Sequence, residues 1–111
     1  VNWRVVTLWV GHVKGWLSIA EHRRKPKHLL VRARRARHIS SLWGEADVYF
    51  DPDADYPYRA VIERDVVARV LADYIKEIDY DAFKPAVKEP ELREAFNHMW
   101  YVLYQYGVEF R

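Results

Sequence analysis

The residues best suited to binding chemistry are the lysines and arginines in the first third of the chain. Eight of them fall within residues 22–38, in two runs separated by a short apolar stretch. Closely spaced cations neutralise successive phosphates and release their counterions, and the planar arginine fork grips phosphate oxygens. The sequence therefore predicts contact with nucleic acid, or with a nucleoprotein complex, through Arg23, Arg24, Lys25, Lys27, Arg32, Arg34, Arg35 and Arg37.

The charge of the chain is unevenly distributed. Residues 1–38 hold ten lysines and arginines and one acid, whereas residues 39–111 hold eight basic and fifteen acidic residues, so the two parts carry +9 and −7. Such a chain either pairs its two parts internally or offers them to different partners. Trp16 and Trp43 flank the basic runs, where their rings could stack on bases.

Acidic and aromatic residues later in the chain suggest a protein partner instead. Asp51, Asp53 and Asp55 alternate in one short segment, and with Asp79 and Asp81 they could occupy a basic groove of another protein. The last predicted helix carries aromatic side chains outside its apolar stripe, a feature typical of interfaces. These are Trp100, Tyr101 and Tyr104. The alternative function is thus a protein-interaction inhibitor, for example in phage counter-defence. The same surfaces could instead join two copies of the chain in a homodimer.

Patterns for catalysis and metal binding are weak. The aspartate run has Tyr56 and Ile62 where an EF-hand loop needs glycine and glutamate, and no two histidines have the spacing of a helical metal pair. A third hypothesis is a small metal-independent ribonuclease, which can use arginine, tyrosine and glutamate side chains for charge stabilisation and proton transfer. The candidate residues are Tyr56, Tyr58, Arg59 and Glu63. We expect a non-enzymatic binding or regulatory protein with no metal and no cofactor.

Length and composition limit the class of protein. A chain of 111 residues with 50% hydrophobic and 15% aromatic residues predicts one folded domain, residues 1–111. The absence of cysteine excludes a disulfide scaffold and a cysteine nucleophile. The sequence has no apolar run long enough for a membrane span and no signal-peptide pattern, so we expect a cytoplasmic protein without membrane contact.

The elements that must position these residues follow from hydrophobic spacing. Residues rich in β-branched and aromatic types predict five strands, at 3–10, 16–20, 29–33, 47–50 and 58–63, with the first two and the last two forming hairpins. Helical spacing predicts a short basic helix from about residue 33 to Gly44.

Two longer helices complete the prediction. One is capped by Asp65 and has an apolar stripe from Val67 to Ile78, and the other begins at Pro90 and ends at Gly107. The order β-β-β-α-β-β-α-α predicts an α+β fold, in which the three helices pack on a mainly antiparallel sheet of about five strands.

Several short strings resemble a family of small uncharacterised proteins of bacteria and their mobile elements. They are residues 16–19, 29–34, 54–61 and 78–84, followed by Trp100. The resemblance covers about residues 16–104. It carries no activity and no functional residues over to this chain, and it favours an accessory or regulatory role over metabolism.

Overall fold

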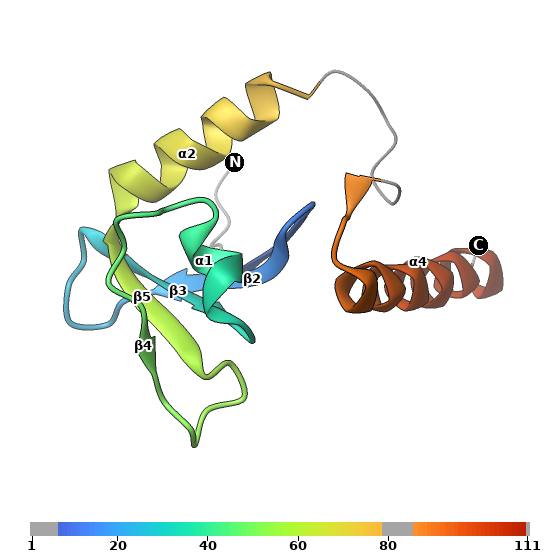
Figure 1. The fold of residues 1–111 in the computed structure, drawn as a ribbon, viewed down its shortest axis with the longest axis horizontal. Helices are drawn as coiled ribbons and strands as arrows, with labels where there is room; N and C mark the ends of the chain where they lie inside the picture. Colours follow the sequence, from blue (N-terminus) through green and yellow to red (C-terminus); the bar gives the residue numbers. More distant parts are fainter. Residues whose placement is uncertain (1–6, 79–85, 111) are drawn as a thin grey trace. The chain divides into compact units, whose positions relative to one another are not determined.

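The chain consists of two compact units in the computed structural model, which describes residues 7–78 and 86–110. Val1–Asp79 form the first unit and Tyr80–Arg111 the second. The first unit contains a five-stranded sheet with helices α1 and α2, and the second contains helix α4 (Figure 1). The predicted α+β class, with an antiparallel sheet and helices, is confirmed.

All five strands join one antiparallel sheet in the order β1-β2-β3-β5-β4. Their bounds are β1 Thr7–His12, β2 Gly15–Glu21, β3 His28–Ala33, β4 Tyr49–Phe50 and β5 Tyr58–Glu63. The bounds of β5 match the prediction, and β3 differs from it by one residue. The first predicted strand begins outside the described residues, and within them it continues to His12.

The β1–β2 hairpin turns tightly because His12 pairs directly with Gly15. A Cβ atom at Gly15 would lie 2.4 Å from Cγ of His38 and 2.8 Å from its Cα. Only glycine lets the imidazole of His38 pack so closely against the start of β2. That imidazole also accepts the backbone N–H of Trp16 at its Nδ1 atom, over 3.2 Å.

The helices of the first unit differ from the prediction at their ends. Helix α1 spans only Ala36–Ser40, because Ala33 still belongs to β3 and Trp43 follows the last turn. Helix α2 spans Arg64–Lys76. The prediction that Asp65 caps α2 is wrong: Glu63 is the N-cap residue and its side chain makes no capping bond. Asp65 instead lies in the first turn, where its charge favours the helix dipole.

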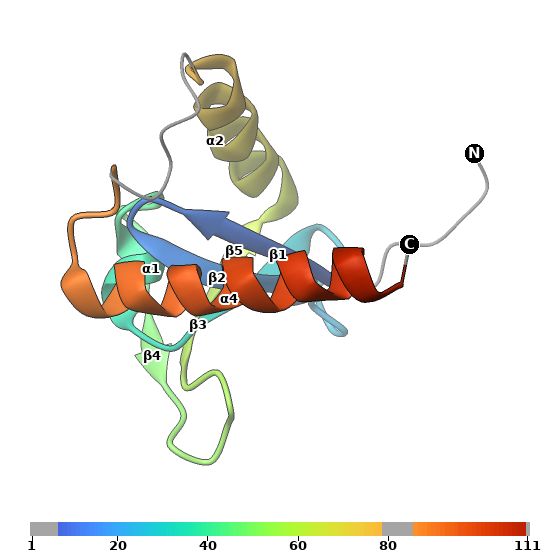
Figure 2. The same cartoon turned by 90° about the vertical axis from the view of Figure 1, so that its right-hand side faces the viewer.

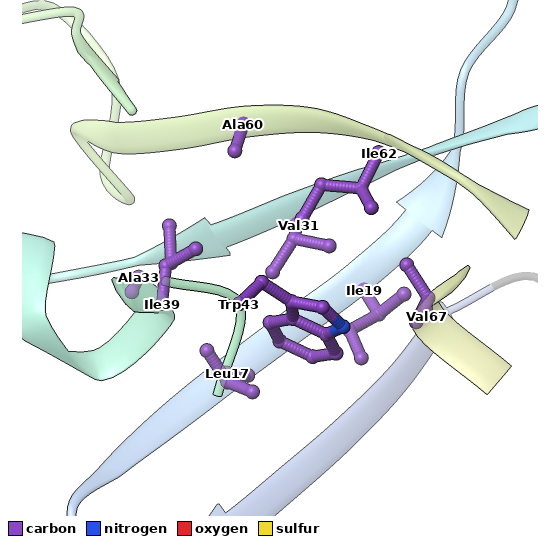
Figure 3. Packing of buried hydrophobic residues seen from close by; sticks show 9 residues of the cluster. All are labelled: Leu17, Ile19, Val31, Ala33, Ile39, Trp43, Ala60, Ile62 and Val67. Carbon is purple, nitrogen blue, oxygen red and sulfur yellow. The ribbon is translucent and has the colours of Figure 1, made fainter. Parts of the chain in front are cut away.

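The hydrophobic core lies between the sheet and the two helices, as Figure 3 shows. It combines strand residues with Ile39 of α1, Val67 of α2 and the ring of Trp43. The strand residues are Leu17, Ile19, Val31, Ala33, Ala60 and Ile62. Trp43 is only 5% exposed, so the expectation that it stacks on bases is wrong. Away from the core, the loop between β4 and β5 extends from the end of the sheet opposite to α2 in Figures 1 and 2.

The second unit is dominated by helix α4, Pro90–Glu109. Pro90 opens the helix as predicted, but the helix continues beyond Gly107, which it tolerates at a cost of about 1 kcal/mol relative to alanine. Helical spacing predicts an apolar stripe of Leu92, Phe96, Met99, Leu103 and Tyr106 in this helix. Leu92 and Phe96 are buried, whereas Leu103 and Tyr106 are more than half exposed. Among the residues that the structure describes, no helix has the length and apolar content to cross a membrane.

Candidate nucleic-acid interface

The sheet has a second face, turned away from α1 and α2, which we call the outer face. Side chains alternate between faces along each strand, so Leu29, Val31 and Ala33 of β3 enter the core while Leu30 and Arg32 lie on the outer face. Residues directly opposite in an antiparallel pair point to the same side. The strand register therefore places every residue that pairs with Arg32 on the outer face as well.

One row of such pairs crosses all five strands. Trp9 pairs with Ser18, Ser18 with Arg32, and Arg32 with Arg59. Tyr49 of β4 pairs with Arg59 and ends the row. The row thus places two arginines side by side between an exposed tryptophan and an exposed tyrosine. Like charges directly opposite destabilise a sheet, so this arrangement calls for a reason other than stability.

Tyr56, in the loop before β5, organises the arginines. Its ring is buried, and the guanidinium carbons of Arg34 and Arg32 lie 4.1 and 5.5 Å from its centroid. Arg59 donates from Nε to the Tyr56 carbonyl oxygen over 3.1 Å, and Arg32 donates from Nη2 to the Ser18 hydroxyl over 2.6 Å. We call Arg32, Arg34 and Arg59 the arginine cluster. Cation–π contact holds two of these guanidinium groups without using their N–H donors.

The arginine cluster retains donors for a ligand. A guanidinium has five N–H groups, and Arg59 uses its Nε while Arg32 uses one terminal nitrogen. The Nε of Arg32 is buried without a hydrogen-bond partner in the described structure, so the donors kept for a ligand are mainly those of Arg34 and Arg59. Within residues 7–78 and 86–110, no carboxylate forms an ion pair with any of the three arginines. Forks that are fixed in place and lack an acidic partner can grip phosphate or carboxylate oxygens in pairs.

A pocket of about 660 Å³ adjoins the cluster on the outer face. Arg32 lines it together with Arg23 and Arg24 from the loop after β2, and Glu21 at the end of β2 adds one carboxylate to the lining. Its floor includes Ala20 and Leu30, which pair across β2 and β3, and the small Ala20 side chain leaves the space open. The pocket therefore connects one end of the predicted basic region with the arginine cluster.

The eight predicted nucleic-acid-binding residues divide into two sets. Arg23, Arg24, Arg32 and Arg34 gather along the outer face. Nothing in the described part of the chain brings the other four to that face: Lys25 and Lys27 are exposed in the β2–β3 loop, and Arg35 and Arg37 are exposed at and within α1.

Sequence reasoning missed Trp9 and Tyr49, and placed Arg59 in a different site. Trp9 is 64% exposed and contacts Trp16, with ring centroids 5.7 Å apart. The alternation of side chains within each strand predicts which residues share a face of that strand. The pairing register between strands that are distant in sequence is needed to show that these residues form one row.

In the acidic segment between β4 and β5, two aspartate side chains accept hydrogen bonds from the backbone of the loop itself. Asp51 accepts the backbone N–H of Asp53 at 3.1 Å, and Asp55 accepts that of Tyr56 at 2.9 Å. No group of three or more candidate metal ligands occurs in the described residues. Asp79 and Asp81, also named as part of an acidic surface, lie outside the described residues.

The residues of the ribonuclease hypothesis are not all on one face. Tyr58 packs against the hydrophobic core, whereas Arg59 lies on the outer face. The Tyr56 ring is buried beneath two arginines. Glu63 pairs with His28 and lies on the outer face with Arg59, so Tyr58 is separated from both of them by the sheet.

A buried histidine on the opposite side of the sheet has a perturbed pKa. Burial lowers the pKa of His12 to about 4, and the charges of His38 and Lys14 add to this effect while the backbone of His38 opposes it. The His12 ring also meets that of Tyr74 edge-on, with centroids 6.1 Å apart. This histidine therefore belongs to the packing of β1 against α1 and α2.

Comparison of the chain with protein-family models, curated proteins and solved structures gives no match.

Proposed function

We propose that this protein is a non-enzymatic nucleic-acid-binding protein and that the outer face of its sheet contacts the phosphates. The observation that carries the proposal is the convergence of Arg32, Arg34 and Arg59 around Tyr56 without an acidic partner among the described residues. A cluster with spare donors is costly in a free protein, because its positive charges repel each other. Phosphate groups would relieve that repulsion and fill the open donors.

A comparison of two charge-matched variants tests the proposal. The site variant R32Q/R34Q/R59Q and the control variant R69Q/K76Q/R93Q each remove three positive charges, and the control residues are exposed on α2 and α4. Binding of a fluorescently labelled oligonucleotide is followed by anisotropy, with single-stranded and duplex probes. We expect the site variant to lose at least tenfold in affinity, since each lost charge-assisted contact is worth about 1.5–3 kcal/mol. The control variant is expected to lose much less.

Equal losses in both variants would contradict the proposal, because binding would then depend on net charge alone. Arg32 bonds to a buried serine, so the triple substitution risks disturbing the fold. R34Q alone provides the safeguard: in the described structure Arg34 holds Tyr56 only through cation–π contact. R34Q should retain the circular dichroism spectrum of the wild type and still bind more weakly.

A protein-interaction role is the second proposal, supported by the last helix. Between Met99 and Phe110 the only charged residue is Glu109, and eight apolar side chains are at least 44% exposed. These are Trp100, Tyr101, Val102, Leu103, Tyr104, Tyr106, Val108 and Phe110. An aromatic side chain can bury about 150–250 Å², so this segment approaches the roughly 800 Å² per partner of a standard interface.

The partner proposed for this segment is a second copy of the chain. Sedimentation velocity of the wild type should show a dimer, and W100S/Y104S should be a monomer. A wild type that sediments as a monomer at every concentration would remove the homodimer. The acidic loop with Asp51, Asp53 and Asp55 remains the alternative surface for a basic protein, and charge reversal there tests it separately.

A further inference from the structure

We infer that the outer face takes single-stranded nucleic acid, with an unpaired base stacked on Trp9 and the backbone on the arginine cluster. This inference rests on the proposed function and names its ligand more narrowly. Three observations carry it: the exposure of Trp9, the breadth of the row, and the direction in which the cations run.

Trp9 offers a ring face to a base. Its side chain is 64% exposed, and the ring of Trp16 braces it at a centroid distance of 5.7 Å and an interplanar angle of 60°. A base within a duplex is already covered by its neighbours on both sides. Only an unpaired base can bring its ring face onto an aromatic side chain, which is how single-strand binding surfaces gain affinity for any sequence.

The breadth of the row disfavours a duplex groove. From Trp9 on β1 to Tyr49 on β4 the row crosses four strand spacings, about 19 Å at roughly 4.8 Å each. The major groove of B-DNA is about 12 Å wide and admits a helix or a two-stranded ribbon. The face of a five-stranded sheet cannot enter it, but a flexible single strand can lie across such a face.

The positively charged side chains lie in a line that follows strand β3. Arg34 and Arg32 lie near its end, and the pocket with Arg23 and Arg24 lies toward its start, a path of about 20 Å at roughly 3.3 Å per residue. Beyond Arg34 the path meets the acidic β4–β5 loop, whose carboxylates would repel phosphates. The pocket at the other end holds one carboxylate, that of Glu21, beside Arg23 and Arg24, so the bound strand should extend from Tyr56 toward these two arginines. A path of this length matches the smallest site sizes of single-strand-binding domains, which cover ~4–16 nucleotides.

Competition binding distinguishes the two ligands. Labelled oligothymidylate is bound to the wild-type protein and displaced by unlabelled oligothymidylate or by a blunt duplex of equal length. We expect the single strand to compete at least tenfold better. We also expect W9A to weaken oligothymidylate binding by about tenfold, because one stacked base is lost.

Two further variants control for the fold. W9F keeps a ring at this position and should restore most of the affinity. I75A removes a 66% exposed apolar side chain from α2, away from the outer face, and should leave binding unchanged. A duplex that competes as well as the single strand, or a W9A variant that binds like the wild type, would overturn the inference while the proposed function stands. If neither probe binds at all, the proposed function fails as well.

Discussion

Ser18 and Tyr56 hold arginines in place without neutralising them. The serine accepts one hydrogen bond from Arg32, and the tyrosine supplies a ring face to two guanidinium groups and a carbonyl oxygen to a third. Neither residue carries a charge, so the positive potential of the cluster is retained. At this scale the site depends on neutral side chains that fix cations, a requirement that composition alone does not reveal.

Buried His12 makes the stability of the fold sensitive to acid. Its pKa falls from 6.5 to about 4 in the folded chain, so between these values the unfolded chain binds the extra proton. The stabilisation is therefore fully present above pH 6.5 and is lost as the pH falls toward 4. Urea unfolding should show a free energy of unfolding that decreases by as much as ~1.4 kcal/mol per pH unit in this window.

The variant H12N isolates that contribution. Its side-chain oxygen can replace Nδ1 as the acceptor for the Lys14 N–H, at 3.3 Å in the wild type, but it does not titrate. H12N should consequently lose less stability than the wild type between pH 7 and pH 5. Parallel pH dependences of the two proteins would show that His12 is not the group responsible.

The close approach of Gly15 to His38 predicts a strong effect of a single methyl group. G15A would place a Cβ atom 2.8 Å from a backbone atom of His38, which cannot rotate away. We expect a loss of about 1–3 kcal/mol in unfolding free energy, as for other overpacked sites. G44A is the matched control, since its nearest neighbour would be 3.7 Å away. Chemical denaturation that ranks the two variants equally would contradict this packing.

Individual elements differ in how well the sequence predicts them. The strand at Tyr58–Glu63 is recognised because apolar residues alternate with polar ones and turn residues precede it. Trp43 was misassigned because it follows a helix of only five residues, where helical spacing does not reveal which side is covered. The sequence does not predict the arginine cluster, because Arg32 and Arg59 are distant in sequence. No local sequence pattern specifies that β5 pairs with β3.

Helix α4 carries a prediction of its own at Gly107. No atom lies within 4 Å of the position that a Cβ would occupy there, and the residue is inside the helix. G107A should therefore stabilise α4 by about 1 kcal/mol, the difference in helix propensity between glycine and alanine. Far-ultraviolet circular dichroism should show an equal or larger helical signal that melts at a higher temperature. A reduced signal would mean that the helix requires the glycine.

At the scale of the whole first unit, four arginines of the basic part keep their charge within the described residues. Arg23, Arg24, Arg32 and Arg34 lie along one sheet face, and no carboxylate of the described residues forms an ion pair with any of them. The charges of these four arginines are therefore concentrated on one side of the sheet. Such a concentration of positive charge should orient the protein toward a polyanion before contact, with an effect that weakens as salt rises.

The dependence of oligonucleotide affinity on salt tests the phosphate contact most directly. For a single strand the slope of log K against log salt is about −0.7 for each phosphate neutralised, so the three residues of the cluster should contribute about −2. We predict that R32Q/R34Q/R59Q has a slope shallower than that of the wild type by about two, and that R69Q/K76Q/R93Q keeps a slope close to the wild-type value. Identical slopes for the wild type and the site variant would show that these arginines do not meet phosphate.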